Sequence, residues 1–223
     1  MKKFKIKKLD NIKMKKLDII QIKLLVKLHN YLYNRISWLS IKLNEGIHPK
    51  HRIMDFHKFF IENIEDNSTV LDIGCGNGAV DYEVAQKAKK VVGVDISKKS
   101  ILYAKKYFSC NNIQYIHGDA LEYQFNEEFD FIILSNVLEH IQDRIPFLNR
   151  IKTIGKYFLI RVPMINRSWL TLYKKELGVE YRLDKSHYIE YTYESFKKEL
   201  EAAGLKVLSH SIQFGEIWAK VSN

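Results

Sequence analysis

The chain has 223 residues, enough for one α/β domain with an appended segment, and its 46% hydrophobic and 28% charged residues exclude a disordered or low-complexity chain. The net charge of +10 is unevenly distributed: residues 1–30 hold ten lysines and two aspartates, whereas residues 31–223 hold 26 basic and 24 acidic residues. This asymmetry favours a basic segment on a nearly neutral globule over a surface built to bind nucleic acid.

Cysteine content and hydropathy favour a cytoplasmic protein. Cys75 and Cys110 form no CxxC pair and are too few for a disulfide framework, which is typical of a reducing compartment. The apolar run 17–28 is interrupted by three charged residues and is followed by no cleavage site, unlike a signal peptide. No stretch approaches the roughly 18 uninterrupted apolar residues of a membrane span.

The N-terminal part is expected to be helical after a mobile start. Residues 1–16 carry too little apolar surface to pack. Between residues 18 and 43, apolar residues recur at spacings of three and four, which predicts a helix with one buried stripe. The stripe comprises Leu25, Leu28, Leu32, Ile36, Leu39 and Leu43. The simpler interpretation is that it packs on its own domain, and the alternative is a helix that contacts a membrane surface or a partner. A second helical stretch covers residues 48–64.

From residue 69 onward, short apolar runs alternate with helical patterns. The runs predict strands at 69–73, 91–94, 113–116, 129–134 and 157–162, and the patterns between them predict helices at 78–89, 97–108 and 144–154. Such alternation indicates a parallel sheet covered on both faces, the doubly wound α/β fold.

The C-terminal part differs from this alternation. A long, aromatic-rich connection over residues 163–191 leads to a helix at 193–203 and two strand-like runs at 205–212 and 214–221. Because so few residues separate the two runs, we expect an antiparallel hairpin at the edge of a seven-stranded, mostly parallel sheet.

The segment 70–78 is the most informative. A strand that contains Asp72 is followed by a loop with glycines at alternate positions, and this loop enters a helix. The glycines are Gly74, Gly76 and Gly78. Glycine lets the backbone approach a ligand, and the helix start offers free N–H groups. The spacing also fits the dinucleotide fingerprint, and Asp95 after the next strand suits ribose hydroxyls in either case, so the loop leaves two nucleoside cofactors open.

Three further features decide between these cofactors: Asp72 before the glycines, Gly118-Asp119-Ala120 after the third strand, and the run 129–140 around the fourth. Together these motifs, within residues 69–162, resemble the class I S-adenosylmethionine-dependent methyltransferases. The resemblance implies a Rossmann-like sheet, S-adenosylmethionine as cofactor and methyl transfer as the reaction.

The resemblance places the methionine end of the cofactor at the fourth and first strands. Asp72 would reach the amino group of the methionine moiety, directly or through water, and the glycine turn, Gly78 included, would line that moiety. Asn136 would lie under the cofactor near the sulfonium.

The nucleoside end is implied to lie at the second and third strands. Asp95 would bind both ribose hydroxyls, with Ile96 against one face of adenine. Asp119 would accept a hydrogen bond from the adenine amino group, while the Ala120 N–H would donate to a ring nitrogen.

Two histidines are candidates for removing a proton from the acceptor. His140 follows the fourth strand, at the edge where strand ends build the ligand crevice, and an imidazole suits a general base near pH 7. His187 lies in a segment, Asp184-x-x-His187, that resembles one common in small-molecule methyltransferases, where the histidine faces the active site. The alternative for Glu139-His140 is that the pair only begins a helix and orders the cofactor pocket.

No metal is expected. In some quinone-pathway relatives an acidic residue three positions before the Glu-His pair completes a divalent-metal site, and Asn136 occupies that position here. His48, His51 and His57 have no cysteine or carboxylate spaced to complete a tetrahedral site.

The acceptor is expected to be a small molecule or a glycan, including one on a lipid carrier. Methylases of exocyclic amines in DNA carry Asn/Asp-Pro-Pro-aromatic after the fourth strand, and this chain does not, so no specific nucleic acid is expected. In class I enzymes the N-terminal helices and insertions late in the sheet cover the acceptor pocket. The acceptor contacts expected on that basis are His51, Arg52, Trp169, Tyr173 and Tyr191, although such aromatic residues also pack lids.

We therefore expect two parts: a basic N-terminal segment with helices over residues 1–65, and a methyltransferase domain over residues 66–223. The first part would serve as a substrate lid or contact a partner, and residues 1–45 would lie against an anionic membrane. A hydroxyl acceptor is favoured. An amine acceptor, and a non-catalytic protein that binds the cofactor or RNA, remain alternatives.

Overall fold

The computed structural model describes residues 16–223, and the prediction that residues 1–16 are mobile falls almost entirely outside this part. The N-terminal helices are α1 (Lys16–Leu43), α2 (Lys50–Met54) and α3 (Phe56–Asn63). The elements that follow in chain order are β1 (Thr69–Ile73), α4 (Ala79–Val84), β2 (Lys90–Asp95), α5 (Lys98–Tyr107), β3 (Ile113–His117), β4 (Phe129–Ser135), the 3-10 turn η2 (Leu138–His140), α6 (Arg144–Ile151), β5 (Gly155–Pro163), α7 (Trp169–Glu176), α8 (Tyr193–Ala202), β6 (Lys206–Gln213) and β7 (Glu216–Ser222).

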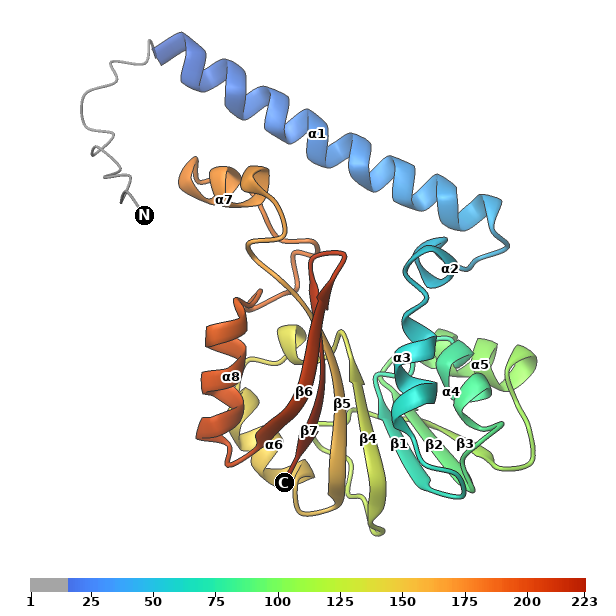
Figure 1. The fold of residues 1–223 in the computed structure, drawn as a ribbon. Helices are drawn as coiled ribbons and strands as arrows, with labels where there is room; N and C mark the ends of the chain where they lie inside the picture. Colours follow the sequence, from blue (N-terminus) through green and yellow to red (C-terminus); the bar gives the residue numbers. More distant parts are fainter. Residues whose placement is uncertain (1–15) are drawn as a thin grey trace.

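The strands form one seven-stranded sheet in the order β3-β2-β1-β4-β5-β7-β6 (Figure 1). The pairs from β3 to β5 are parallel, and β7 pairs antiparallel with both β5 and β6. The predicted doubly wound sheet with a C-terminal antiparallel hairpin is therefore confirmed. Strand order reverses between β1 and β4, so their carboxyl ends border the crevice in which doubly wound sheets bind ligands.

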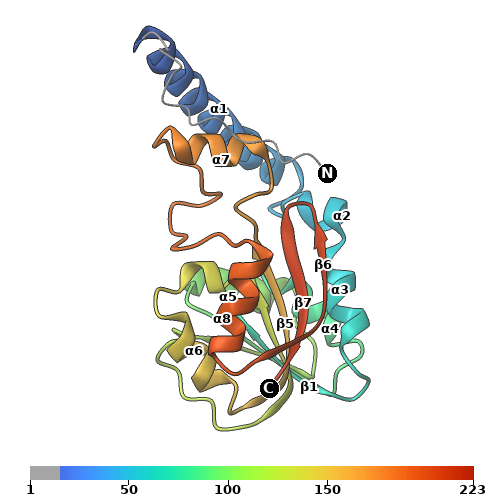
Figure 2. The ribbon, with the colours of Figure 1, turned by 60° about the vertical axis from the view of Figure 1, so that its left-hand side comes forward.

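Helices cover both faces of the sheet (Figures 1 and 2). On one face, α6 and α8 pack against alternate strand residues such as Leu71 and Ile132. On the other face, α3 and α4 pack against the intervening residues, such as Val70 and Phe131. Both residue sets are apolar because a parallel sheet with two covered faces exposes neither face to water. Phe60 of α3 belongs to this core, so the packing crosses the expected boundary between residues 65 and 66.

Two helical predictions need correction. The stretch 48–64 is not one helix, because Asp55 adopts a left-handed φ of 49° and separates α2 from α3. The connection 163–191 contains α7, which was not predicted from the sequence. The side chain of Ser168 caps α7 by accepting a hydrogen bond from the Thr171 N–H, which explains where this helix begins.

Helix α1 was expected to bury its apolar stripe, and this expectation is wrong. The six stripe residues from Leu25 to Leu43 are 44–83% exposed, and Val26 is the one buried side chain among the described α1 residues. The spacing correctly placed the six residues on adjoining parts of the helix surface, but periodicity alone does not reveal what covers them. None of the described helices combines the length and apolarity needed to cross a membrane.

Candidate active site

Three glycines with left-handed backbone angles form the turn after β1. The angle φ is 76° at Gly74, 57° at Gly76 and 78° at Gly78, in a region that residues with a Cβ rarely adopt. A Cβ at Gly74 would lie 2.7 Å from Val137, and one at Gly78 would lie 2.4 Å from the Tyr115 hydroxyl. A Cβ at Gly76 would meet nothing within 4 Å. Gly74 and Gly78 are thus required by the packing of the chain itself, whereas Gly76 borders space that a ligand can enter.

Asp72 of β1 is buried beside Asp81 of α4. Asp72 Oδ1 and both carboxylate oxygens of Asp81 have no hydrogen-bond partner among the described residues. Burial, followed by the charge of Asp81, raises the pKa of Asp72, and burial raises the pKa of Asp81 to about 7. A buried acceptor without a donor is unfavourable. The role of Asp72 toward the amino group of the cofactor remains a prediction.

Asp95 connects the end of β2 to the glycine turn. Its Oδ2 accepts a hydrogen bond of 2.8 Å from the Gly76 N–H, and its Oδ1 accepts one of 2.7 Å from the Ser97 N–H. Each carboxylate oxygen can accept more than one hydrogen bond, so both remain able to accept from ribose hydroxyls. Ile96 next to it is 68% exposed, which leaves its side chain accessible to an adenine ring.

Asp119 and Ala120 follow β3 in a half-buried turn. Asp119 Oδ1 accepts a hydrogen bond of 2.8 Å from the Leu121 N–H, and the Ala120 carbonyl accepts one from the Arg150 guanidinium. Within residues 16–223, no acceptor is found for the Ala120 N–H. That donor is therefore free for the ring nitrogen assigned to it by the resemblance.

Asn136 lies at the centre of a polar cluster below the crevice. It has a left-handed φ of 58°. Its Oδ1 accepts hydrogen bonds from Arg161, of which the one from Nε is 3.0 Å long, and its Nδ2 donates to Glu139 Oε1 at 2.9 Å. Arg161 is buried on β5, lies 3.5 Å from the centre of the Phe56 ring, and pairs with Glu216 of β7 at 3.2 Å. The amide of Asn136 is thus fixed between a cation and a carboxyl group.

Asp81, Arg161 and Glu216 were not predicted from the sequence. Each lies in a segment whose pattern indicated an ordinary helix or strand. An arginine within the apolar run of the fifth strand was the one available signal, because a buried guanidinium requires a partner.

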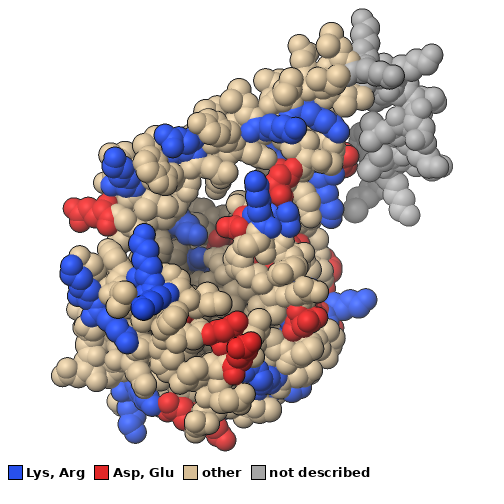
Figure 3. Space-filling model, turned by 180° about the vertical axis from the view of Figure 1, so that it is seen from behind, with Lys and Arg blue, Asp and Glu red and all other residues tan. Residues whose placement is uncertain are grey.

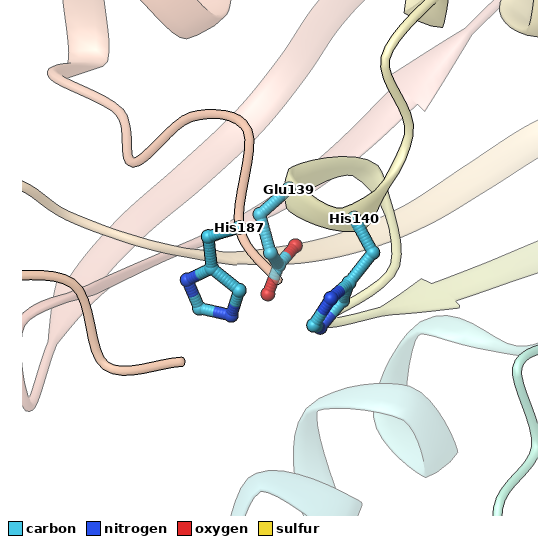
Figure 4. A group of neighbouring side chains, drawn as sticks. All are labelled: Glu139, His140 and His187. Carbon is cyan, nitrogen blue, oxygen red and sulfur yellow. The ribbon is translucent and has the colours of Figure 1, made fainter. Parts of the chain in front are cut away.

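Glu139, His140 and His187 lie together at the carboxyl end of β4. Figure 4 shows the three side chains turned toward one another, Glu139 and His140 from η2 and His187 from the loop between α7 and α8. The two imidazole rings meet edge to face, with centres 4.6 Å apart. One ligand-type atom of each residue lies within 4.8 Å of the others. The structure therefore brings both predicted base candidates into one site.

Neighbouring side chains determine which atoms of this trio are free. Ser186 donates its hydroxyl hydrogen to Asp184 at 2.6 Å, so its oxygen is available to accept from His140 Nδ1 at 2.9 Å. His187 Nδ1 lies 3.2 Å from Glu190 Oε1, a carboxylate that can only accept when ionised. Both imidazoles in their neutral form would thus carry the lone pair on Nε2.

Glu139 completes this arrangement. It is fully buried, and its Oε2 has no partner among the described residues. Burial raises the pKa of Glu139 to about 7, and burial followed by the nearby His187 lowers the pKa of His140. The trio thus places an imidazole with a lowered pKa, that of His140, beside a carboxyl group that changes charge near neutrality.

The same three residues could also hold a divalent cation. Two imidazole nitrogens and one carboxylate oxygen form a donor set found in metal enzymes. Asp184, through Ser186, and Glu190 would orient the two rings, as outer carboxylates do in such sites. A bound cation would lower the pKa of an acceptor hydroxyl. The expectation of no metal remains a prediction.

His51 belongs to a second chain of hydrogen bonds, on α2 and α3. His51 Nδ1 lies 2.8 Å from His57 Nε2, and His57 Nδ1 lies 2.8 Å from Glu83 Oε1 of α4. Burial, followed by the proximity of His57, lowers the pKa of His51 to about 3, so His51 is neutral. Arg52 is exposed on α2. The roles of both residues in acceptor binding remain predictions.

The predicted aromatic contacts lie in different environments. Trp169 on α7 is 74% exposed, and its ring centre lies 6.1 Å from that of Tyr173 on the same helix. Tyr191, by contrast, is completely buried in the core, and its hydroxyl donates to Glu199 at 2.6 Å. The prediction that Tyr191 binds the acceptor is therefore wrong, because its ring packs against Phe196 and reaches no open surface.

The fold and the glycine turn agree with the comparison with protein families. A family model described as a methyltransferase domain matches residues 46–210, well over half of the chain. The chain belongs to this methyltransferase family. The class I assignment from the sequence is confirmed, and S-adenosylmethionine is the cofactor.

Curated relatives of this methyltransferase are named for methylation of oxygen in one case and of nitrogen in another. It is 34% identical over 123 residues to a ubiquinone biosynthesis O-methyltransferase of Bartonella tribocorum, a match that covers 53% of this chain and 49% of that protein. It is 34% identical over 104 residues to a probable (S)-tetrahydroprotoberberine N-methyltransferase 2 of Papaver bracteatum, covering 44% of this chain and 29% of that one. The matched region is thus about half or less of these relatives.

Solved structures support the fold over a longer range. An S-adenosylmethionine-dependent methyltransferase of Clostridium acetobutylicum superposes with a TM-score of 0.61 at 16% identity, covering 86% of this chain and 98% of that one. A TehB-like enzyme of Corynebacterium glutamicum gives a TM-score of 0.59 at 17% identity, with 88% and 99% covered. At such identities the likeness establishes the fold of the methyltransferase and leaves its acceptor open.

Proposed function

We propose that this methyltransferase transfers the methyl group of S-adenosylmethionine to a hydroxyl group of a small, ring-shaped acceptor, with His140 as general base. Methyl transfer from a sulfonium is an in-line displacement, in which the acceptor oxygen forms a bond to the methyl carbon as the carbon–sulfur bond breaks. The acceptor also loses a proton, and the other product is S-adenosylhomocysteine. The protein must align the two reactants and accept that proton.

The observation that carries this proposal is the hydrogen bonding of His140. Its side chain is exposed at the site, its pKa is lowered, and its Nδ1 is engaged by Ser186. Nε2 is consequently the atom that would take the proton. The hydrogen bond through Ser186 to Asp184 would then stabilise the imidazolium. His187 is buried, which suits it to position His140 by edge-to-face contact.

The acceptor class is inferred from side chains and relatives. Trp169 and Tyr173 offer flat faces suited to an aromatic or sugar ring. Seven of the curated relatives are named for O-methylation in ubiquinone biosynthesis, which favours a hydroxyl. A glycan acceptor rests on the side chains alone.

A second candidate is N-methylation of a small amine. The relative from Papaver bracteatum, which is named as an N-methyltransferase, favours it. An amine needs no base once it is deprotonated in solution, so its methylation would depend far less on His140.

The assay uses methyl-labelled S-adenosylmethionine and matched pairs of ring-shaped acceptors. In each pair, one member carries a hydroxyl group where the other carries an amine. We expect label transfer to the hydroxyl member and formation of S-adenosylhomocysteine. Label transfer to amines alone would establish the second candidate. The protein is also incubated with fractionated extracts of the source cells. If it binds the cofactor but methylates no compound in any fraction, the proposal that it is an enzyme is wrong.

Variants test the base. His140→Gln should lower turnover by at least about 100-fold while cofactor affinity stays unchanged, and Ser186→Ala should lower it less. His210→Gln, on the exposed β6, is the matched control. Dialysis against EDTA should leave turnover intact, and a loss restored by one divalent cation would assign the trio to metal binding instead.

A further inference from the structure

Helix α1 contacts the rest of the protein along one narrow side. Val26 is the buried residue of this side, and His29, Asn30 and Ser37 provide its side-chain hydrogen bonds. Asn30 Nδ2 donates to the Glu180 carbonyl at 2.8 Å, and its Oδ1 accepts from Lys174 Nζ at 2.6 Å. Figures 1 and 2 show α1 lying beyond α7 and α2, away from the sheet.

The side of α1 that faces solvent is apolar over most of its length. At about 100° per residue, five leucines fall within an arc of roughly 80° whose centre lies about 160° from Val26. They are Leu17, Leu24, Leu28, Leu32 and Leu39, and they are 44–67% exposed. Ile20, Tyr31 and Trp38, all more than half exposed, adjoin one edge of this arc. We call these eight residues the outer face of α1. Exposed apolar surface of this extent is typical of an interaction site.

The charge of α1 indicates what covers the outer face. The helix carries five basic residues against one aspartate, and residues 1–30 together carry ten lysines and two aspartates. By the same rotation, Arg35 and Lys42 fall within the arc of the leucines, toward the C-terminal end of the helix, and they lie 5.0 and 5.8 Å from the centre of the Trp38 ring. Two copies of α1 packed face to face would bring these like charges together, whereas an anionic surface would be attracted to them.

The arrangement matches a helix that lies in the plane of a bilayer surface. Such helices bury an apolar face among the acyl chains while basic side chains reach the headgroups, and tryptophan and tyrosine favour that boundary. We propose that α1 binds an anionic lipid surface through its outer face, with Lys27, Arg35 and Lys42 contacting the headgroups.

This orientation would also bring the site close to the lipid. The carboxyl end of β5 leads to α7, which contacts α1, so α1 lies on the side of the molecule to which the strands of the site point (Figure 1). Seen from behind, a hollow opens beneath α1, with both basic and acidic side chains at its rim (Figure 3). The surface and the site are nevertheless separate, and lipid binding does not depend on which acceptor is used.

The test is sedimentation of the full-length chain with vesicles, at low salt and at 0.5 M NaCl. We expect at least tenfold stronger partitioning onto vesicles containing 30% phosphatidylserine than onto pure phosphatidylcholine, and a decrease at high salt. Absence of binding to the anionic vesicles, or equal and salt-insensitive binding to both, would overturn the proposal.

Two variants separate charge from apolar contact. Lys27→Glu/Arg35→Glu/Lys42→Glu and Leu24→Gln/Leu28→Gln/Leu32→Gln should each reduce partitioning at least tenfold. The matched control, Lys105→Glu/Lys106→Glu/Lys198→Glu, makes the same charge change at exposed lysines of α5 and α8 and should bind as the unaltered chain does.

The melting temperature by circular dichroism and the affinity for the cofactor should be unchanged in all three variants. The substituted residues are exposed, and none of them is among the residues predicted to bind the cofactor. If the α1 charge variant partitions like the control variant, the proposal is wrong. Self-association in analytical ultracentrifugation that the leucine variant abolishes, without vesicle binding by the unaltered chain, would assign the outer face to a second copy.

Discussion

Asp95 combines two tasks in one carboxylate. It holds the N–H groups of Gly76 and Ser97, and it is predicted to bind the cofactor ribose. Asp95→Ala should therefore weaken S-adenosylmethionine binding by at least about 1 kcal/mol, measured by calorimetry. Asp66→Ala changes an exposed residue just before β1, at the amino ends of the parallel strands, and should leave the affinity unchanged. Equal affinities of the two variants would remove Asp95 from the cofactor site.

Glu139 makes stability depend on pH. Burial raises its pKa to about 7 in the folded protein, above its ordinary value of about 4.5. The folded state thus binds the proton more tightly, so this stabilising contribution is present below pH 4.5 and is lost as the pH rises toward 7. The loss amounts to at most about 3–4 kcal/mol, since each pKa unit corresponds to about 1.4 kcal/mol.

Glu139→Gln removes this titration while keeping a similar shape. Urea unfolding at pH 5 and pH 7.5 should show a smaller drop in the free energy of unfolding for the variant than for the unaltered chain. The same drop in both proteins would mean that other groups, such as Asp72 and Asp81, account for the whole pH dependence of stability.

At the scale of elements, α8 illustrates how local sequence defines a boundary. Thr192 accepts a hydrogen bond from the Ser195 N–H, and the Ser195 hydroxyl bonds back to the Thr192 backbone, which forms a capping box. Thr192→Ala should lower the free energy of unfolding by about 1 kcal/mol, whereas Thr192→Ser, which keeps the acceptor oxygen, should cost much less. Equal losses in chemical denaturation would show that packing of the threonine methyl group, not the cap, is responsible.

The strands were the elements most accurately predicted. Short apolar runs bounded by polar turns located all seven, and the strand at 69–73 was predicted with its observed bounds, because the central strands β1, β2, β4 and β5 are covered on both faces and are mostly apolar. The helices were predicted less accurately. Helix α4 ends at Val84, well before the predicted residue 89, and α7 went unnoticed among aromatic residues without clear periodicity.

The residues of the candidate site also differ in how well the sequence predicts them. Residues in ordered motifs, such as Asp72, Asp95 and His140, could be found from the sequence because spacing and chemistry coincide there. Asp81 and Glu216 could not, because their importance arises from contacts across the fold with Asp72 and Arg161. Tyr191 was misassigned for the opposite reason, since an aromatic residue beside a functional loop packs into the core as readily as it faces a ligand.

At the scale of the whole molecule, α1 stands apart from the cooperative core. Only Val26 of its described side chains is buried, and the family match begins at residue 46. A chain shortened to residues 46–223 should therefore melt within about 5 °C of the full-length chain, since a loss of 1 kcal/mol shifts the melting midpoint by about 2–4 °C at this size. A decrease of more than about 10 °C in calorimetry would show that α1 belongs to the folding unit.

The ion pair between Arg161 and Glu216 has a consequence for how the sheet closes. The guanidinium is anchored on β5, but its counter-ion is carried by β7, which pairs with β5 only after the chain has passed through α7, α8 and β6. The two charges are thus about 55 residues apart in sequence, and their pairing is a long-range contact that forms when the C-terminal hairpin docks on the parallel strands. Docking of β7 therefore removes the guanidinium from water and supplies its counter-ion in the same event, so the polar cluster around Asn136 is completed by the hairpin.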